Sequence, residues 1–377
     1  METRVALRRC GSYAPADIET ALTRCLCDLG GLDIYVRPGM RVALKCNLLL
    51  PMRPEQGGTT HPALVAALVR MIQAIGAVPF IIDSPGGPYA KTMLRTVYRV
   101  TGMHEVSKKT GAELNLDTTT ADIAAPRAKQ LPRMQVLKPL IEADFIIDLP
   151  KLKTHGFMLF TGAVKNMFGA IPGVEKAEYH LRMKDPEDFG RTMVDICEAL
   201  RPGLTIMDGI EAMEGNGPSA GRVKKANMLL ASPSPYALDL AAAWLGTLPI
   251  DRIFTVQEAI ERGLCPTGPG GLKWLGDDPD ALRVRLVLPD AHKPGILRRF
   301  IRSRSLGTWM QPRPVIDTRR CVGCGICAKN CPPKTIDIAD KKAVIRYEDC
   351  IRCYCCQELC PEKAVEIRRS VVFKWLK

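Results

Sequence analysis

The chain has 377 residues, of which 46% are hydrophobic and 25% are charged, and its formal net charge is +13. This length and composition suit a globular protein with one large core and room for a small second domain. No uncharged apolar run of about 18 residues occurs, which excludes a helix that spans a membrane, and no signal-peptide stretch follows Met1. We therefore expect a cytoplasmic protein.

The first 295 residues alternate short apolar segments with segments whose apolar residues recur at helical spacing. The expected strands are Val5–Leu7, Arg41–Leu50, Val78–Ile82, Phe145–Leu149, Leu204–Met207 and Met228–Ala231. The expected helices are Asp17–Leu29, a helix that Thr60 caps, Arg191–Leu200 and Tyr236–Leu245. Near-continuous apolar strands separated by helices predict an α/β domain over residues 1–295, with a parallel or mixed sheet covered by helices.

Polar residues follow several of these strands, at the edge where open α/β sheets bind ligands. Lys45 and Asn47 lie at the end of the second strand, and Lys165 and Asn166 follow a glycine-rich stretch. These four residues are candidates for binding a cofactor or another ligand. A lysine after a strand is often simply solvated, so the interpretation rests on the group and not on any one member.

The segment after Phe145–Leu149 carries the candidate catalytic residues Lys151, Lys153 and His155. In an extended segment these three share one face, because side chains alternate with period two. Two ammonium groups and an imidazole suit an anionic ligand. The ordinary pKa of a histidine lies near neutrality, which makes His155 the candidate proton donor.

Several common cofactor and catalytic motifs are missing from this domain. No Gly-x-Gly-x-x-Gly follows a strand, no phosphate-loop spacing occurs around Lys165, and there is no Gly-x-Ser-x-Gly elbow. The sequence therefore gives no nicotinamide, flavin or nucleotide fingerprint.

Eight cysteines near the C-terminus form two copies of the pattern Cys-x2-Cys-x2-Cys-x3-Cys-Pro, 29 residues apart. Three closely spaced thiolates and a fourth beyond them are typical of cubane iron–sulfur ligands, and in two-cluster folds the fourth cysteine serves the other cluster. The spacing predicts two 4Fe-4S clusters, one held by Cys321, Cys324, Cys327 and Cys360 and the other by Cys350, Cys353, Cys356 and Cys331. Zinc sites would show paired two-cysteine knuckles instead. Cys355 breaks the spacing and is interpreted as a bystander.

Residues 313–370 are therefore predicted to form a small α+β, ferredoxin-like domain with pseudo-twofold symmetry. The 30 residues up to Arg320 contain eight basic residues and one acidic residue, which can offset the charge of the clusters and steer an acidic partner. Nucleic-acid binding is disfavoured, because the aromatic residues that stack on bases are few here. Residues 296–312 are expected to be a basic linker that packs on the first domain, and residues 371–377 an apolar tail that docks on the protein or a partner.

Five segments of the α/β domain together resemble one known family. They are Thr59–Leu64, Asp83–Gly86, Asp148–His155, Thr161–Gly169 and Asp208–Pro218. Over roughly residues 40–250 the chain is similar to the bacterial and archaeal family of domain of unknown function 362 (DUF362), and the C-terminal part resembles bacterial-type two-cluster ferredoxins. The resemblance implies an iron–sulfur protein of anaerobic metabolism. It implies no substrate and no catalytic residues.

Two functions remain open at this point. In the first, the protein is an electron-transfer protein whose two clusters relay electrons to or from a site in the α/β domain or a redox partner protein. In the second, it is a ferredoxin-coupled reductase that acts on an anionic small molecule or cofactor bound at the strand ends. The sequence does not decide whether the chain is an enzyme.

Overall fold

The computed structural model describes residues 2–173, 175–293 and 312–368. All but the last residue of the expected basic linker, and the expected tail at 371–377, lie outside the described residues.

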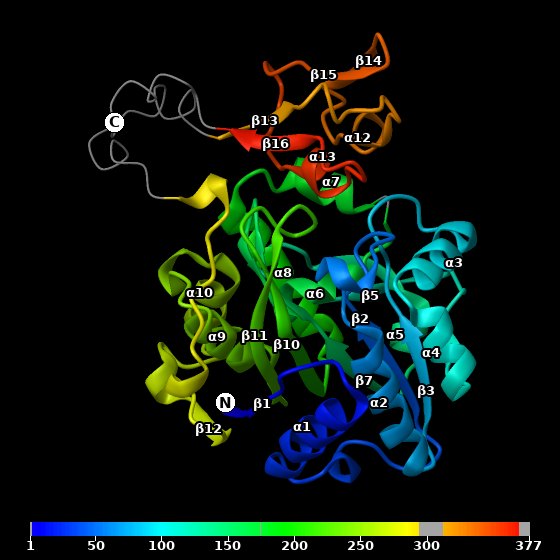
Figure 1. Ribbon diagram of the computed structural model, residues 1–377, viewed down its shortest axis with the longest axis vertical. Helices are drawn as coiled ribbons and strands as arrows, with labels where there is room; N and C mark the ends of the chain where they lie inside the picture. The colour runs from blue at the N-terminus through cyan, green and yellow to red at the C-terminus, as the bar shows by residue number, and fades with distance from the viewer. Residues whose placement is uncertain (1, 174, 294–311, 369–377) are drawn as a thin grey trace.

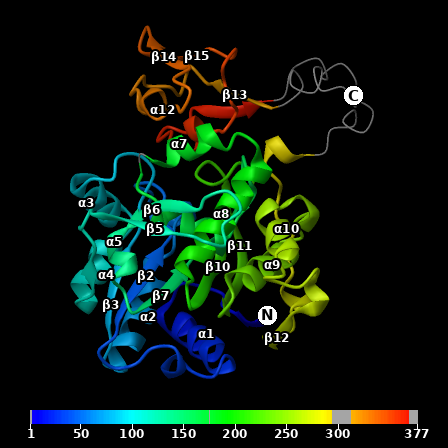
Figure 2. The same cartoon turned by 180° about the vertical axis from the view of Figure 1, so that it is seen from behind.

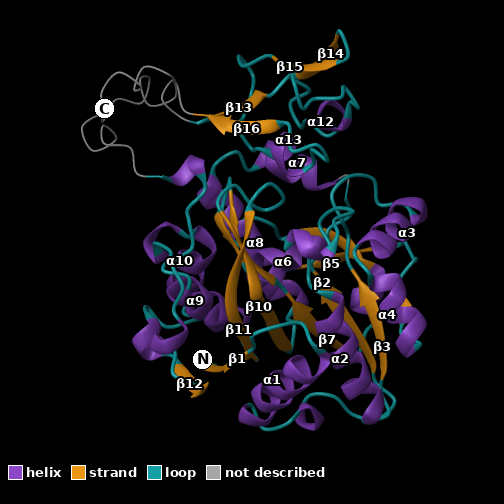
Figure 3. Cartoon of the chain, viewed as in Figure 1, coloured by secondary structure: helices purple, strands orange, loops and turns teal. Residues whose placement is uncertain are grey.

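Ten strands of the described chain form one mixed sheet, in the order β12-β1-β11-β10-β7-β2-β3-β4, with β8 paired to β10 and β9 to β8 (Figures 1 and 3). Its strands are β1 (Arg4–Arg9), β2 (Arg41–Cys46), β3 (Val78–Ile82), β4 (Glu113–Leu114), β7 (Phe145–Leu149), β8 (Lys151–His155), β9 (Leu159–Thr161), β10 (Leu204–Glu214), β11 (Arg222–Ser232) and β12 (Lys273–Gly276). The neighbours β10, β7, β2, β3 and β4 are parallel, whereas β11 runs antiparallel to both β1 and β10. A separate antiparallel hairpin consists of β5 (Thr120–Ala124) and β6 (Arg133–Leu137).

Helices cover both faces of the sheet, so each face has its own hydrophobic core. One core contains α1 (Pro15–Asp28), α2 (Pro62–Ala74), α3 (Lys91–Val100) and α4 (Met103–Thr110). The other contains α5 (Lys138–Ile141), α6 (Ala163–Asn166), α7 (Glu175–Arg182), α8 (Pro186–Leu200), α9 (Pro235–Leu245) and α10 (Phe254–Glu261). Short 3-10 turns are η1 (Leu32–Ile34), η2 (Pro54–Gln56), η3 (Met167–Ala170), η4 (Ile250–Arg252), η5 (Pro269–Gly271), η6 (Asp280–Leu282) and η7 (Asp290–His292). The predicted α/β fold with a helix-covered mixed sheet is confirmed.

The start of α2 differs from the expectation. The N-cap residue is His61 and not Thr60: the His61 ring accepts a hydrogen bond from the backbone amide of Ala63. The Thr60 hydroxyl instead donates to the carbonyl oxygen of Leu149 at 2.6 Å and accepts from the amide of Asn47 at 2.8 Å. Thr60 thus links the ends of β2 and β7. Because its hydroxyl is used in these two hydrogen bonds, it does not cap the helix.

The small domain repeats itself element by element. Strand β13 (Arg313–Ile316) pairs with β16 (Val365–Arg368), and β14 (Ile336–Ala339) pairs with β15 (Lys342–Ile345), both antiparallel. Helix α12 spans Ile326–Lys329 and α13 spans Cys355–Glu358. Each element of the first half, β13, α12 and β14, recurs 29 residues later as β15, α13 and β16, so the repeat of the cysteine motif is also a repeat of the backbone.

The two domains pack directly on one another. Tyr354 and Ile367 of the small domain belong to the hydrophobic core of the large domain. The Gln357 side chain donates to the carbonyl oxygen of Asn216 at 2.8 Å, and the Ser219 hydroxyl donates to the carbonyl oxygen of Glu358 at 2.8 Å. Accordingly, α13 lies beside α7, whereas β14 and β15 lie on the far side of the small domain (Figures 1 and 2).

A buried ion pair fixes the carboxyl ends of β2 and β3. Val42, Leu44 and Cys46 belong to the core of the α1 and α2 side, so the alternating Lys45 points to the opposite face. There the Lys45 ammonium lies 2.8 Å from the Asp83 carboxylate, and both side chains are almost completely buried.

Gly169 closes over this ion pair, and the position has no room for a side chain. A Cβ at residue 169 would overlap the Asp83 carboxylate and lie 2.5 Å from the Lys45 Nζ atom. We expect Gly169→Ala to lower the free energy of unfolding by about 3–5 kcal/mol, because it separates a buried pair. Denaturant unfolding measures this. Gly11→Ala, where nothing lies within 4 Å, is the control and should change stability by less than about 0.5 kcal/mol. Equal stability of both variants would contradict the role of the pair.

Candidate functional site

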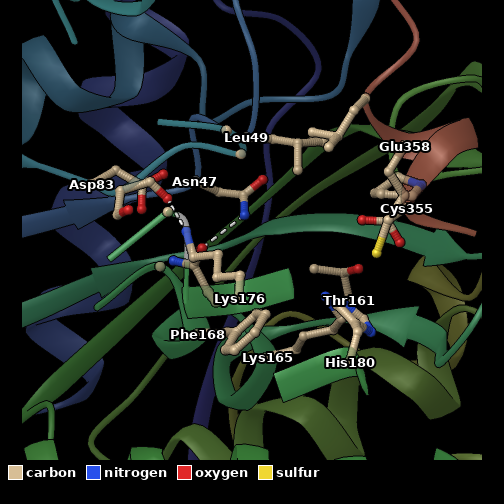
Figure 4. Close-up of a pocket in the computed structure, with 18 of the residues that line it drawn as sticks. Asn47, Leu49, Asp83, Thr161, Lys165, Phe168, Lys176, His180, Cys355 and Glu358 are labelled. Atoms are coloured by element: carbon tan, nitrogen blue, oxygen red, sulfur yellow. Dashed lines mark hydrogen bonds between the residues drawn. The ribbon is translucent and has the colours of Figure 1, made fainter. Parts of the chain in front are cut away.

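A cavity lies between the two domains, at the carboxyl ends of the central strands. Its empty volume is about 790 Å³, including the part open to solvent. The large domain contributes residues that follow β2 and β3, residues of β8 and β9, and residues of α6, η3 and α7, and the small domain contributes Asn330, Cys355, Glu358 and Leu359. In Figure 4, Asp83 and Lys176 lie toward one end and Cys355 and Glu358 toward the other, with Asn47 between them.

Three lysines line the cavity. The Lys153 ammonium donates to the Asn47 side-chain oxygen at 2.6 Å and to the carbonyl oxygen of Gly58 at 2.7 Å. Lys176 donates to the carbonyl oxygen of Ser84. The Lys165 ammonium makes no hydrogen bond or ion pair with any described residue and lies 5.8 Å from the centre of the Phe168 ring. The cavity therefore holds an ammonium group with unused donors.

Burial shifts the protonation of all three lysines toward the neutral form. It lowers the pKa of Lys176 to about 7, and burial together with the nearby Lys165 charge lowers the pKa of Lys153 to about 7. The pKa of Lys165 is also lowered by burial. A bound anion would reverse these shifts, because it stabilises the charged form.

Three buried polar atoms in the cavity lining have neither a hydrogen-bond partner nor an ion-pair partner among the described residues. They are Ser84 Oγ, Thr161 Oγ1 and His180 Nδ1. Buried polar atoms in folded proteins are nearly always paired, with protein, water or a ligand. Together with the free ammonium of Lys165, they give the cavity both donors and acceptors for a small polar molecule.

His155 forms a polar contact between the domains instead of lining the cavity. Its Nδ1 accepts from the amides of Phe157 at 3.0 Å and Met158 at 3.2 Å, so the proton of the neutral ring sits on Nε2. That atom lies 3.1 Å from a Glu358 carboxylate oxygen, close enough for electrostatic attraction, although the two are not aligned as a hydrogen bond. Burial lowers the pKa of His155 to about 4. Burial opposes ionisation of Glu358, but His155 and Lys165 outweigh it and hold the pKa of this carboxyl at about 2.

The structure brings some of the candidate residues together and separates others. The cavity lining contains Asn47, Lys153, Lys165 and Asn166. It does not contain Lys45, Lys151 or His155.

Lys151 lies in a different polar cluster from Lys153. Its ammonium donates to the Tyr13 hydroxyl at 2.6 Å and to the Asp208 carboxylate at 2.9 Å. The register of β8 against β10 shifts between Lys151 and Lys153, because Lys151 pairs with Asp208 and Lys153 with Met213. This irregular pairing accounts for the different surroundings of Lys151 and Lys153, which were expected to share one face of the strand.

The lining residues that were not among the sequence candidates include Lys176, His180, Cys355 and Glu358, whose side chains can take part in acid–base or thiol chemistry. Lys176 and His180 come from α7, and the other two lie on α13 in the small domain. In the sequence, the position of Cys355 and Glu358 in the second cysteine motif was the one sign that they could belong to a site. No sequence pattern indicated a functional role for Lys176 or His180.

The eight motif cysteines gather in two sets in the small domain. A second cavity, with about 360 Å³ of empty volume and a largely apolar lining, contains Cys321, Cys324, Cys327 and Cys360. Near Cys356, burial raises the pKa of the thiol well above its ordinary value, and the neighbouring Cys353, Cys350 and Cys331 add to the rise. Each set thus combines three cysteines of one motif with the fourth of the other.

Two of the thiols accept backbone hydrogen bonds at equivalent positions of the two motifs. Among the described residues, no group of three or more His, Cys, Asp or Glu side chains is close enough to hold a single metal ion. Backbone amides reach the fourth cysteines at equivalent places: Thr335 N lies 3.4 Å from Cys331 Sγ, and Ala364 N lies 3.3 Å from Cys360 Sγ. Such hydrogen bonds to sulfur are typical of iron–sulfur ligands. The residues present fit a 4Fe-4S group.

An α/β domain joined to a small domain with two cysteine sets defines a class of two-domain iron–sulfur proteins. Family models match the description "Domain of unknown function (DUF362)" at residues 42–244 and "4Fe-4S dicluster domain" at residues 313–361. The chain belongs to the DUF362 family and carries a C-terminal 4Fe-4S dicluster domain, as the sequence resemblance indicated.

A curated relative and a solved structure were also found. The chain is 35% identical over 272 residues to the thylakoid-associated protein sll1697 of Synechocystis, covering 71% of this chain and 82% of that protein. The lactate racemase apoprotein from Thermoanaerobacterium thermosaccharolyticum matches with a TM-score of 0.43 and 12% identity, over 66% of this chain and 58% of that one. Within the described residues, no helix has the length and apolar character needed to cross a bilayer.

Cysteine variants can test which cysteines hold which cluster. Reconstituted protein should contain about eight irons per chain. Because Cys360 belongs with the first motif, Cys360→Ala should remove the same cluster as Cys324→Ala and leave the other, as judged by iron content and electron paramagnetic resonance of the reduced protein. Cys331→Ala should match Cys353→Ala in the same way. Cys197→Ala, in the core of the large domain, is the control and should keep all eight irons. If Cys360→Ala instead removed the cluster assigned to Cys350, Cys353 and Cys356, the assignment of Cys360 to the first cluster would be wrong.

Proposed function

We propose that the protein is an iron–sulfur electron-transfer protein that holds two 4Fe-4S clusters and relays electrons between a redox partner and the cavity between its domains. Cys321, Cys324, Cys327 and Cys360 would hold one cluster, and Cys331, Cys350, Cys353 and Cys356 the other. When bound, the clusters supply one-electron transfer at low potential.

The position of Cys356 carries this proposal. Its chain neighbour Cys355 lines the interdomain cavity, and so does Glu358 two residues further on. The second cysteine set therefore lies directly behind the cavity wall. On the other side of the small domain, Cys324 of the first set is exposed to solvent. The two sets thus connect the outer surface to the cavity, an arrangement that suits a relay.

The contents of the cavity favour a second, more specific function: reduction of an anionic small molecule bound there. Lys165 and Lys176 flank the Phe168 ring, each with its ammonium 5.8 Å from the ring centre, and would hold the negative charge of the ligand. Asn47 would orient it, because its amide already spans Lys153 and Asn166.

A reduction by two electrons also takes up protons, and Lys153 is the best placed donor. Its pKa of about 7 lets it give up a proton at neutral pH, as general acid catalysis requires. His155 suits this role less well than the sequence indicated, because its pKa of about 4 leaves the ring neutral. We assign His155 the role of positioning Glu358 at the cavity wall.

Binding of a small anion tests the second function and separates it from a pure carrier. Inorganic phosphate and short carboxylates, titrated by calorimetry, should give saturable binding to the iron-loaded protein. Lys165→Met should weaken it about ten- to a hundredfold, the loss expected for one charged hydrogen bond. Lys91→Met, on the exposed side of α3, is the matched control and should leave the affinity unchanged. If no anion binds in a saturable way, the protein is a carrier and the reductase function is wrong.

The lysine pKa values predict how this affinity depends on pH. Lys153 and Lys176 are charged below their pKa of about 7 and neutral above it, so the affinity for a short carboxylate, whose own charge is constant in this range, should fall as the pH rises from 6 to 8. The fall should be about tenfold for each lysine that the ligand requires, with uptake of protons on binding at pH 8. Calorimetry in buffers of different ionisation heat measures both.

Two titratable groups near these lysines do not contribute to the pH dependence between pH 6 and 8. The charges that act on Lys153 and Lys176 are those of Lys45, Asp83, Lys151, Lys165 and Glu358. The carboxyl of Glu358, with a pKa of about 2, and the ring of His180, with a pKa lowered to about 3 by burial, keep one protonation state between pH 6 and 8. Lys176→Met should therefore reduce the pH slope, and an affinity equal at pH 6 and pH 8 would contradict the assignment.

A further inference from the structure

The first cysteine motif lies under an exposed apolar face of the small domain. Three side chains of this face, Val322, Ile326 and Ile338, are 60%, 37% and 41% exposed. The same three residues line the cavity that contains the first cysteine set, so a molecule resting on them lies directly over that set. Cys324 itself is exposed between them in the sequence. We call Val322, Cys324, Ile326 and Ile338 the outer face.

Basic side chains border the outer face. Lys329 lies one helical turn after Ile326 on α12, which places the two on the same side of the helix. Gly323 packs so closely on Lys341 that a Cβ there would overlap the Lys341 carbonyl oxygen. The Arg319 side chain is 91% exposed, and its guanidinium lies 3.6 Å from the Asp317 carboxylate. We call Arg319, Lys329 and Lys341 the basic rim.

The charge around this face is predominantly positive. Residues 319–342 contain six basic and two acidic residues. One of the two acids, Asp337, already pairs with Arg346. The side chains of Lys329 and Lys341 make no ion pair with any described residue, so their charge remains available to a partner. Glu362 is an acidic residue beside the same cavity and limits the excess without cancelling it.

The opposite side of the small domain is already occupied. Helix α13 and its neighbours pack on the large domain through the contacts of Tyr354, Gln357 and Glu358. Of the two cysteine sets, only the first has a ligand exposed to solvent, at Cys324. Because Cys350 of the second set is only partly exposed, the outer face gives a redox partner the most direct access to a cysteine ligand.

The observations distinguish between possible occupants. A second copy of this chain carries the same net charge of +13 and would bring its own basic rim against this one. An acidic protein meets an opposite charge, which speeds encounter and sets orientation. A small apolar centre with a charged rim is typical of the weak, transient interfaces of electron-transfer complexes, which bury less than about 1,200 Å².

We propose that the outer face and its basic rim form the docking site of an acidic one-electron carrier protein. This inference rests on the proposed relay function and adds to it the surface and the chemistry of the partner. The apolar residues exclude water above the first cysteine set, and the rim selects an acidic carrier over a basic one.

Binding to an immobilised, strongly acidic plant-type ferredoxin tests the inference, with surface plasmon resonance as the readout. The affinity should fall steeply as salt is raised from about 20 to 500 mM, since the screening length shrinks several-fold. Charge reversal of the rim in R319E/K329E/K341E should weaken binding at low salt at least about tenfold. Val322→Ser should weaken it with little change in the salt dependence.

A matched control removes the effect of net charge. K91E/R95E/R99E reverses three exposed basic residues of α3 and changes the total charge by the same amount. This variant should retain the affinity of the unmodified protein within about twofold. Equal losses in both triple variants would show that overall charge, and not the outer face, attracts the carrier, and would overturn the inference.

Failure of the inference can be told from failure of the relay function. Iron content and reduction by dithionite test the relay without any carrier. If the protein holds eight irons and is reduced, but the acidic ferredoxin does not bind or the rim variant binds as well as the unmodified protein, the docking site is wrong and the relay stands. If fewer than eight irons bind to the unmodified protein, the relay is wrong. A rim variant that lost its irons would be replaced by the single variants Lys329→Glu and Lys341→Glu.

Discussion

The need to pair buried ammonium groups determines how the strand ends of the large domain are arranged. A buried, unpaired charge costs several kcal/mol, so most of the buried lysines near the strand ends lie against an oxygen. Lys45 meets Asp83 and Lys151 meets Asp208, which ties β2 to the end of β3 and β8 to β10. Once these oxygens are taken, the cations left over can be satisfied only from the cavity, and Lys165 is the clearest example. The cavity therefore keeps a lysine without an oxygen partner in the described part of the chain, because the nearby carboxylates at the strand ends are already paired with other lysines.

The parts of the structure that could be predicted from the sequence are those in which nearby residues determine the outcome. Apolar runs such as Val78–Ile82 and Phe145–Leu149 became strands at the expected places, because a buried parallel strand needs little beyond its own composition. The cysteine repeat anticipated the small domain in more detail. Its period of 29 residues reappears in every strand and helix of that domain, since four ligands of a compact group leave the backbone few alternatives.

The rest depends on partners far away in the chain. Thr60 has the residue type of a helix cap, yet its hydroxyl is drawn to the Leu149 carbonyl, which no local pattern reveals. The sequence placed Lys151 and Lys153 on one face of a strand, but it did not reveal the shift of register against β10 that separates them. Lys176 and Glu358 meet at one cavity although 182 positions separate them, because their elements belong to different domains that fold against each other. Such contacts depend on tertiary packing, which the hydrophobic periodicity of the sequence does not predict.

The two domains share a hydrophobic core, so they are structurally less independent than their separate sequence motifs suggest. Tyr354 and Ile367 are counted among the interior residues of the large domain, and His155 faces a carboxylate from the small one. Cutting the gene at the linker would therefore not release two autonomous parts. It would expose Tyr354 and Ile367 on the small domain. It would also remove the Glu358 carboxylate from the buried His155 ring of the large domain. A chain that kept this large domain without its ferredoxin-like neighbour would expose that apolar seam to water, so substitutions on the two sides of the seam constrain one another.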